Sequence, residues 1–357
     1  MWYIISNMSV DISKFSTMKV GGSVTDIRKI KDKASLLQSI ESSARLRVPF
    51  FVLGEGSNTI FRDIEHSLIV LKMENAGISI EKSDRKNTLV RVGAGERWDN
   101  FVKWSVENNF SGIEALSGIP GTVGASPIQN IGAYGSEVKN TIALIEAYDT
   151  TVDEFVNIPR ERCGFEYRNS VFKKNPGRFI PPPSRVPRGK VGGFIIWSVY
   201  FNLCRNSVPV IPKYKDIIEY FEEKNISAPN LNQIRETVLE IRARKLPDPS
   251  VIPSCGSFFK NPILTNEAAD NLKFKYPEMP VFPVSRDRSK ISAGWLIEKA
   301  GLKGYAENNI GVYEHNALVL INRGGGSFED LDNLRNRIKE KILSAFGIML
   351  EEEVNIV

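Results

Sequence analysis

The chain has 357 residues, of which 42% are hydrophobic and 25% are charged, a composition typical of a soluble globular protein with two or three domains. Its net charge of +5 is spread along the sequence, and neither a basic stripe with interleaved aromatic residues, nor an apolar run of membrane-spanning length, nor a signal peptide is evident. We therefore expect no nucleic-acid partner and no membrane attachment. Three widely spaced cysteines and only two histidines argue against a metal site or a histidine triad, and the cysteines favour a reducing cytoplasm.

The first third of the chain predicts alternating strands and helices. Residues 16–30 suggest a strand with a kink at its two glycines, and residues 32–47 have the apolar spacing of a helix. The apolar run 48–54 is typical of a buried strand and ends in GEGSN (54–58). A Gly-rich turn beyond a strand's carboxyl end is where α/β proteins bind ligands, although a tight turn needs the same residues. GEGSN is not GxGxxG and no helical pattern follows it, so we reject a Rossmann dinucleotide unit.

The next region also has α/β character. Strands are expected at 67–72 and 89–95, a helix at 98–108, a hairpin of 142–149 with 155–159, and a closing strand at 192–203. The Pro-rich and basic segment 174–192 predicts an exposed loop.

Six glycines fall within 24 residues between the helix and the hairpin, in GIEALSGIPGTVGASPIQNIGAYGSEV: Gly112, Gly118, Gly121, Gly124, Gly132 and Gly135. Such a segment can expose backbone N–H groups and reach positive φ, and consecutive amides of this kind can hold a diphosphate. The alternative is a long irregular loop, which is uncommon in a compact domain unless it is functional. We expect a cofactor cradle.

The pattern changes near Pro212, where we place a domain boundary. Helices are predicted at 214–224, 231–245, 266–274, 292–301 and 328–346, and a strand at 315–322. In the tail, alternation over 348–356 puts Leu350, Val354 and Ile356 on one face and Glu351 and Glu353 on the other.

Five separated segments, in order, closely resemble the UDP-N-acetylenolpyruvoylglucosamine reductase (MurB) family in its form with a tyrosine loop. They are GEGSN (54–58), SGIPGTVGASPIQNIGAYG (117–135), YRNSVFK (167–173), KLPDPSVIPSCGSFFKNP (245–262) and LEEEV (350–354). FSTMKVGG (15–22) and SAGWLIEKAGLKG (292–304) match as well, so the resemblance covers nearly the whole chain.

The resemblance implies an α+β protein with an FAD-binding fold of the vanillyl-alcohol-oxidase type. Two FAD-binding subdomains are expected at 1–73 and 74–212, a substrate-binding domain at 213–346, and a C-terminal strand at 347–357 that returns to the active site. It implies an enzyme of peptidoglycan precursor synthesis, and hence of cell-wall biogenesis, cell shape and division. In this reaction NADPH reduces FAD, and the flavin N5 gives hydride to the methylene carbon of UDP-N-acetylglucosamine enolpyruvate. A hydroxyl then protonates the neighbouring carbon, which yields UDP-N-acetylmuramate. We expect a cytoplasmic monomer.

Three residues carry the catalytic motif of the family. Arg168 matches the arginine that binds and polarises the substrate carboxylate, Ser257 the proton donor, and Glu353 the carboxyl group that stabilises the intermediate together with the arginine. Each has a plainer alternative: a surface ion pair, a loop cap and a solvated terminal run. Alternation alone does not choose between Glu351 and Glu353, whereas the match to LE-x-EV selects Glu353.

The remaining expected site residues bind the cofactor or the substrate. For FAD they are Gly54, Glu55, Gly56, Ser57, Asn58, Ser117, Gly118, Ile119, Gly121, Thr122 and Gly124; for the substrate or nicotinamide nucleotide they are Tyr214, Lys245, Asn261 and Asn316. Tyr214 has an alternative as an aromatic residue packed at a helix start. The tail departs from the family at Glu352, where proline is frequent, and at Asn355, where arginine is frequent. Two other functions are kept open: another FAD-linked oxidoreductase of the same fold, and a non-catalytic flavin- or nucleotide-binding protein.

Overall fold

The computed structural model describes residues 9–173, 178–179, 193–205 and 209–357. These residues form two compact units. Unit 1 contains Val24–Glu55 and Glu65–Arg242, and unit 2 contains Asp11–Ser23, Gly56–Ile64 and Ala243–Val357. The boundaries of the two units differ from those of the four predicted domains. Residues 213–242, for example, belong to unit 1 and not with the residues that follow them. The four ranges therefore stay a prediction about functional domains.

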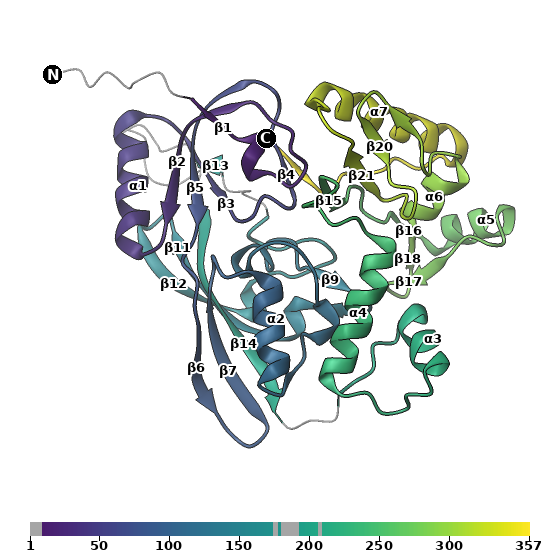
Figure 1. Ribbon diagram of the computed structural model, residues 1–357, viewed down its shortest axis with the longest axis horizontal. Coiled ribbons are helices and arrows are strands. Elements are labelled where there is room, and N and C mark those ends of the chain that lie inside the picture. Colours follow the sequence, from purple (N-terminus) through teal and green to yellow (C-terminus); the bar gives the residue numbers. More distant parts are fainter. Residues whose placement is uncertain (1–8, 174–177, 180–192, 206–208) are drawn as a thin grey trace. The chain divides into compact units, whose positions relative to one another are not determined.

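The first sheet of unit 1 has the strand order β1-β2-β5-β3-β13. Its strands are β1 (Val10–Asp11), β2 (Ser23–Ile30), β5 (Glu65–Met73), β3 (Phe50–Leu53) and β13 (Arg178–Phe179). The helix predicted at 32–47 is confirmed as α1 (Lys33–Leu46), which starts in a capping box at Asp32 and lies beside β2 (Figure 1). Strand β2 begins only at Ser23, later than predicted, and Gly22 just before it lies so close to Ile64 that a Cβ would stand 2.0 Å from the Ile64 carbonyl oxygen.

The second sheet of unit 1 has the order β12-β11-β14-β7-β6, and β8 pairs with β14. Its strands are β6 (Ile78–Ser83), β7 (Asn87–Gly93), β8 (Phe110–Ser111), β11 (Ile142–Asp149), β12 (Glu154–Pro159) and β14 (Phe194–Arg205). The predicted hairpin is confirmed as β11–β12. The sequence does not predict β6, because its apolar alternation is limited to Ile78 and Ile80 and its residues are almost all exposed. The loop predicted at 174–192 lies outside the described residues except at β13.

Helix α2 (Trp98–Glu107), predicted at 98–108, is anchored in the core of unit 1 by its aromatic residues. Trp98 and Phe101 are fully buried, and the ring centroids of Phe101 and Phe201 lie 4.7 Å apart. The indole Nε1 of Trp98 donates a hydrogen bond to the Leu116 carbonyl at 2.9 Å. This bond satisfies the polar atom of a buried tryptophan and fixes the start of the Gly-rich segment against the helix.

Helices α3 (Lys215–Glu223) and α4 (Leu231–Lys245) follow the predicted positions closely. They bury Ile217 and Phe221 of α3 against Ile234, Val238 and Ile241 of α4. These spacings of three and four residues are the apolar face from which the helices are predicted. Within the Gly-rich segment, β9 (Gly132–Ala133) and β10 (Ser136–Glu137) form a small antiparallel pair.

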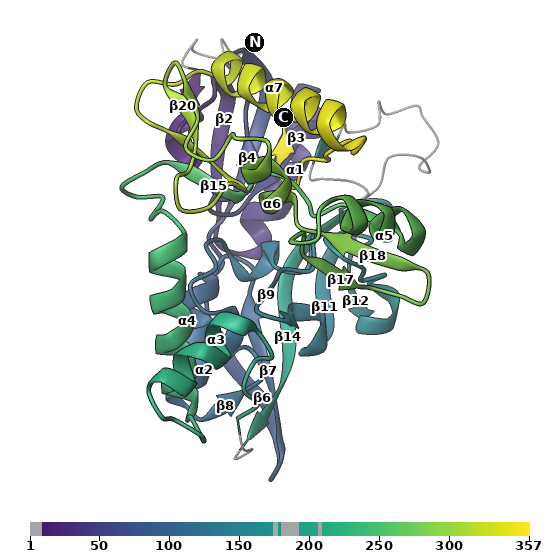
Figure 2. The same ribbon diagram turned by 90° about the vertical axis from the view of Figure 1, so that its right-hand side faces the viewer.

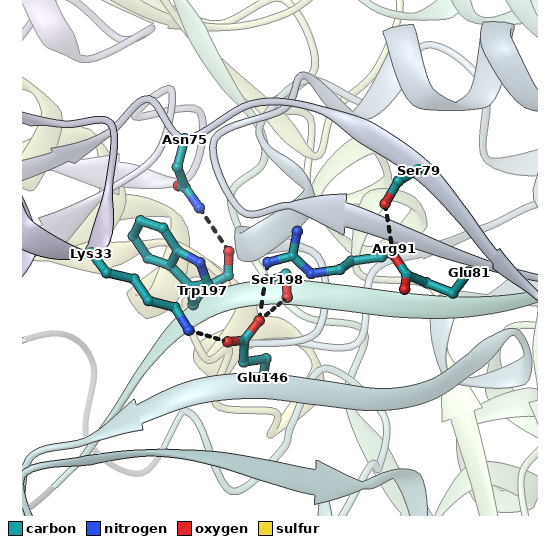
Figure 3. A network of polar contacts seen from close by, with 8 residues as sticks. All are labelled: Lys33, Asn75, Ser79, Glu81, Arg91, Glu146, Trp197 and Ser198. Atoms are coloured by element: carbon teal, nitrogen blue, oxygen red, sulfur yellow. Dashed lines mark hydrogen bonds and ion pairs between the residues drawn. The ribbon is translucent and has the colours of Figure 1, made fainter.

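A polar network on the second sheet is centred on Glu146 of β11 (Figure 3). The carboxylate accepts hydrogen bonds from Lys33 Nζ at 2.6 Å and from Arg91 Nη2 at 3.1 Å. It also accepts one from Ser198 Oγ at 2.7 Å. Burial opposes ionisation of Glu146, but these three donors outweigh it and hold the pKa of the carboxyl below its usual value. The network therefore joins α1, β7 and β14 through one ionised group.

Replacing Glu146 with alanine is expected to lower the free energy of unfolding by about 1–2 kcal/mol, because three donors lose their acceptor while Lys33 remains partly solvated. Since the folded pKa is depressed, this contribution is present above the unfolded pKa and is lost as the pH falls through the folded pKa. Urea unfolding at pH 7 and near pH 4 measures it. Glu81→Ala, on the exposed strand β6 of Figure 3, is the control. An equal effect of both substitutions would contradict the role of Glu146.

Unit 2 has a four-stranded sheet of order β15-β21-β20-β19, a three-stranded sheet of order β16-β18-β17, and the parallel pair β22–β4. Its strands are β4 (Thr59–Ile60), β15 (Ser254–Ser257), β16 (Ile263–Thr265), β17 (Val281–Pro283), β18 (Arg288–Ile291), β19 (Ala306–Glu307), β20 (Ile310–Val312), β21 (Val319–Asn322) and β22 (Asn355–Ile356). Its helices are α5 (Asn266–Lys275), α6 (Ala293–Lys299) and α7 (Phe328–Phe346). Helix α7 lies beside β20 (Figure 2), with Leu334 and Ile338 fully buried.

Two predictions in unit 2 need correction. The strand predicted at 315–322 begins only at Val319, because Asn316 closes a turn: its Oδ1 accepts from Leu318 N at 3.0 Å and its carbonyl accepts from Val319 N at 3.0 Å. Alternation does not hold through 348–356 either. The chain bends at Glu353 and Val354 before the short strand β22, so the tail buries both Glu353 and Val354.

Candidate functional site

The turn after β3 belongs partly to each unit, and its first half is packed against the Gly-rich segment of unit 1. A Cβ on Gly54 would lie 2.6 Å from Thr122 Oγ1, so glycine is needed for this approach. The carbonyl of Gly54 accepts a hydrogen bond from Lys72 Nζ at 2.5 Å. Burial lowers the pKa of the Lys72 ammonium, against the opposing effect of Glu55 and a second carboxylate. A partly buried cation thus stands at the end of β3.

The amides of the Gly-rich segment are largely bound within the protein, contrary to the expectation that they are exposed. Gly118 N donates to Asp99 Oδ1 at 2.6 Å, and Gly121 N donates to Glu55 Oε2 at 3.0 Å. Gly124 N donates to the carbonyl of Ala94 at 2.9 Å. Two of these amides are bound because the carboxylates of Asp99 and Glu55 accept their hydrogen bonds, and each carboxylate is paired with an arginine. A diphosphate would therefore require donors other than these three amides, or would have to displace their acceptors.

The neighbouring predicted cofactor residues also lie in this segment. Ser117 is fully buried and its Oγ donates to the Glu114 carbonyl at 2.7 Å. Ile119 packs against the core of unit 1, and Thr122 is buried. The structure therefore brings Gly54, Glu55 and residues 117–124 together in unit 1. Their contact with FAD stays a prediction.

Arg168 lies at the tip of a tight turn in which Glu166 and Asn169 pair with each other. Its φ of +52° is unfavourable for a residue with a Cβ, a conformation that is more common at functional sites than elsewhere. The guanidinium Nη2 donates to the carbonyl of Gly132 at 3.0 Å. Arg168 therefore reaches the second half of the Gly-rich segment, as a residue that serves the same site would.

Tyr214 is the residue before helix α3 in unit 1 and is 41% exposed. Its ring meets Tyr134 edge to face, with centroids 5.1 Å apart. This position agrees with the alternative of an aromatic packed at a helix start, and it leaves part of the side chain accessible. A role in substrate binding stays a prediction.

The second half of the turn, Gly56–Asn58, belongs to unit 2 and holds the C-terminal tail. Gly56 has a φ of +69°, and a Cβ there would lie 2.0 Å from the carbonyl oxygen of Phe15. Asn58 Nδ2 donates to the carbonyl of Glu353 at 3.2 Å, and the Asn58 carbonyl accepts from Asn355 N at 2.9 Å. Asn58 and its neighbour Ser57, both predicted to bind FAD, are thus placed beside the predicted catalytic tail.

Ser257 ends strand β15, where a bulge interrupts the pairing with β21. Ser254 pairs with Ile321 and Ser257 with Val319, so Cys255 and Gly256 together face one residue of β21. Gly256 adopts a φ of +71°. The bulge breaks the alternation that would put Ser257 on the same face as Cys255. As a result Cys255 is buried, with burial raising the pKa of its thiol to about 12, whereas Ser257 is only partly buried.

The tail runs antiparallel to the segment that follows Ser257. Glu353 N donates to the carbonyl of Phe258 at 2.8 Å, and Lys260 N donates to the carbonyl of Glu351 at 2.9 Å. Glu353 is 8% exposed, whereas the side chain of Glu351 is 74% exposed and pairs with Lys260. Burial thus distinguishes Glu353 from Glu351, which sequence alternation alone does not. The tail places Glu353 next to the residue that follows Ser257.

The two departures in the tail have local partners. Glu352 pairs with Lys339 at 2.9 Å and with Arg335 at 3.6 Å, both on α7. Asn355 lies in β22 opposite Thr59. These contacts fix the tail on either side of Glu353 without engaging the Glu353 side chain.

Alanine at Gly256 is expected to lower the free energy of unfolding by about 1–2 kcal/mol, because L-residues are strained at positive φ even where space is open. It should also slow any reaction in which Ser257 takes part, since relief of the strain would turn β15. Gly347→Ala is the matched control: Gly347 has a φ of +70°, equally open space, and a place at the end of α7. Urea unfolding and turnover measure both variants. Equal loss of turnover in the two would contradict the bulge's role.

The other predicted substrate residues lie in unit 2. Asn261 Oδ1 accepts from Ala293 N at 2.9 Å and so supports the first residue of α6. Asn316 closes the turn before β21, and the carbonyl of Leu318 in that turn accepts a hydrogen bond from Phe258 N at 2.8 Å. Lys245 is the last residue of α4 and is exposed. Asn316 therefore lies two residues from a direct contact with the Ser257 segment, and Asn261 follows that segment directly.

Unit 2 thus brings together Ser257, Glu353 and Asn58, while unit 1 brings together Arg168 and the Gly-rich segment. The sequence does not point to Asp99, Lys72 or Arg97, since each is an isolated charged residue outside any motif. Arg97 Nε pairs with Glu55 at 2.8 Å.

In the described part of the chain, no group of three His, Cys, Asp or Glu residues could hold a metal ion. No helix there has both the length and the apolar character needed to cross a membrane.

Comparisons with known proteins match two parts of the chain to family models and nearly all of it to curated relatives. The family model for "UDP-N-acetylenolpyruvoylglucosamine reductase, C-terminal domain" matches residues 248–357, and that for "FAD binding domain" matches residues 27–151. The UDP-N-acetylenolpyruvoylglucosamine reductase of Polynucleobacter asymbioticus is 41% identical over 92% of this chain and 90% of its own length. That of Dechloromonas aromatica is 35% identical over 97% of both chains.

The fold is similar to a solved structure. The crystal structure of UDP-N-acetylenolpyruvylglucosamine reductase (MurB) from Thermus caldophilus aligns with 98% of both chains at a TM-score of 0.65 and 22% identity. Together with the match of residues 27–151 and the mixed helices and strands, this confirms the predicted class: an α+β protein with an FAD-binding fold.

Proposed function

Since this chain belongs to the UDP-N-acetylenolpyruvoylglucosamine reductase (MurB) family, we propose that it reduces UDP-N-acetylglucosamine enolpyruvate to UDP-N-acetylmuramate with electrons from NADPH. The observation that supports the proposal is the pairing of the tail with the segment after Ser257, in which Glu353 N donates to the carbonyl of Phe258, Glu353 is buried and Ser257 is partly buried. We further propose that the enzyme acts in the cytoplasm as a monomer.

The residues of unit 1 suit an FAD. The matched FAD-binding domain contains the partly buried cation Lys72 at the end of β3 and the left-handed glycines of the Gly-rich segment. Gly54, Glu55 and residues 117–124 would hold the cofactor, with Gly56, Ser57 and Asn58 completing the turn. When bound, FAD would supply the redox chemistry by taking a hydride from NADPH and giving it to the methylene carbon of the substrate.

Arg168 would bind the substrate carboxylate. Reduction of an electron-rich enol ether places negative charge on the carbon next to that carboxylate, so a cation aimed at the carboxylate is expected to supply a large part of catalysis. A guanidinium can bind a carboxylate with two parallel hydrogen bonds, which a lysine cannot. The position of Arg168 at the tip of the turn at Glu166–Asn169, with a φ of +52°, supports this proposal. Tyr214, Lys245, Asn261 and Asn316 would bind the rest of the substrate.

Ser257 would complete the reaction by giving its hydroxyl proton to the carbon next to the carboxylate. Among the described residues no hydrogen bond leads from the Ser257 hydroxyl to another protein group, which leaves it available to a substrate. Glu353, protonated, would assist Arg168 in stabilising the negative charge. The bulge at Gly256 and the bond from Glu353 N to the Phe258 carbonyl support this arrangement.

An anaerobic titration in two steps tests the proposal. The purified protein should be yellow, NADPH should bleach the flavin absorption, and UDP-N-acetylglucosamine enolpyruvate should restore it with formation of UDP-N-acetylmuramate. Bleaching without restoration would favour another FAD-linked oxidoreductase. A protein that binds flavin but is not bleached by NADPH would be a flavin-binding protein without this activity. A purified protein that contains no flavin would contradict the assignment of FAD as its cofactor.

A further inference from the structure

Asp99, the second residue of α2, stands between the Gly-rich segment and helix α4 within unit 1. Its Oδ1 accepts hydrogen bonds from Gly118 N at 2.6 Å and from Arg235 Nη1 at 2.7 Å. Its Oδ2 accepts from Arg235 Nη2 at 2.7 Å. The guanidinium therefore binds the carboxylate in a bidentate manner, a geometry that fixes the orientation of the ion pair. Helix α2, the Gly-rich segment and the distant helix α4 therefore meet at one side chain.

Gly118 is held from its other side by the same helix. It has a φ of +71°, and a Cβ there would lie 2.8 Å from Leu239 Cδ2 and 3.0 Å from Arg242 Nε. Side chains of helix α4 thus pack directly over Gly118, whose positive φ favours glycine, while Arg235 of the same helix orients the acceptor of the Gly118 amide. The Gly118 peptide is therefore held by Asp99 of α2 and packed by side chains of α4.

The Asp99–Arg235 pair is shielded from water on the arginine side, where the Arg235 side chain is only 11% exposed. Burial opposes ionisation of Asp99, but the bonds from Arg235 and from Gly118 outweigh it, so the pKa of the carboxyl lies below its usual value. Asp99 is therefore ionised at neutral pH, when charge-assisted bonds to both partners are strongest.

We propose that Asp99 and Arg235 are positioning residues for the flavin: they fix the Gly118 peptide and so hold residues 117–124 in the form that receives FAD. The inference rests on the proposed function, since it assumes that this segment lies against the cofactor. Neither residue is required to touch the flavin. Their action is carried by one backbone amide and by the packing of α4 on Gly118.

The test uses the holoenzyme and the variants Arg235→Met and Asp99→Asn. Arg235→Met keeps the acceptor of the Gly118 amide and removes the group that orients it. Asp99→Asn keeps an acceptor and removes the charge. Both are expected to release FAD into flavin-free buffer about tenfold faster than the unchanged protein and to alter the visible circular dichroism of the bound flavin, because the cradle relaxes. Lys103→Met, in an exposed pair with Glu107 on the same helix, is the control and should change neither.

The outcomes separate this inference from the function on which it rests. If the unchanged protein holds FAD and turns over, but both variants release FAD at the normal rate with an unaltered flavin spectrum, the pair is structural and the inference fails, whatever the melting temperature does. If Arg235→Met does not fold, the milder Asp99→Asn decides by the same two measurements. If the unchanged protein binds no FAD, the proposed function fails first.

Discussion

Alanine at position 257 is expected to slow the reoxidation of the reduced flavin by UDP-N-acetylglucosamine enolpyruvate by about 10²–10⁴-fold, the range in which a general acid contributes to a rate. Reduction of the flavin by NADPH should stay nearly normal, because that half-reaction needs no proton from Ser257. The two half-reactions are followed separately by anaerobic stopped-flow absorbance. The position of Ser257 after a bulge, with only partial burial, lets the side chain be shortened without opening the core.

Ser257→Thr is the matched variant, since it keeps a hydroxyl at the same place. It should retain more of the reoxidation rate than Ser257→Ala does. A variant at an exposed serine, Ser285→Ala, controls for nonspecific effects in the same unit. If Ser257→Ala lost both half-reactions equally, Ser257 would have a structural role and another group would have to supply the proton.

Much of the fold is predictable from local patterns. Helices α1, α2, α4 and α7 and the hairpin β11–β12 lie at or within two residues of their predicted positions, because each has one apolar face or a clear turn. The failures have physical causes. Strand β6 is almost fully exposed and has only two alternating apolar residues, and the side chain of Asn316 makes the segment before Val319 a turn. Both depend on neighbours that are distant in sequence or on a single side-chain contact.

The candidate site divides in the same way. The motifs locate Arg168, Ser257 and the Gly-rich segment, and the resemblance selects Glu353. The sequence does not indicate which backbone amides of the Gly-rich segment are hydrogen-bonded within the protein. Their acceptors, Asp99 and Glu55, lie outside that segment. Nor does alternation reveal that Glu353 is buried and Glu351 exposed, since the chain bends between β22 and α7. Nonlocal hydrogen bonds decide both points.

Methionine at position 168 is expected to reduce the rate of flavin reoxidation by the substrate by about 10²–10³-fold, because the charge that develops next to the substrate carboxylate would lose its cation. Reduction by NADPH should again be little changed. The reoxidation rate of Arg168→Lys should lie between those of the unchanged protein and Arg168→Met, since lysine keeps the charge but not the paired hydrogen bonds of a guanidinium. Substrate binding should weaken in both variants, which distinguishes Arg168 from Ser257.

Arg162→Met provides the matched control for this substitution, because Arg162 is an exposed arginine six residues earlier in the same unit. It should leave both half-reactions unchanged. Arg168 also donates to the Gly132 carbonyl, so part of any loss could come from the turn itself. The melting temperature measures that part: a large fall in it, with equal loss of both half-reactions, would make Arg168 a structural residue. A selective loss of reoxidation in a protein of nearly normal melting temperature would instead require the guanidinium to meet the substrate, because a disturbed turn has no means of distinguishing the two half-reactions.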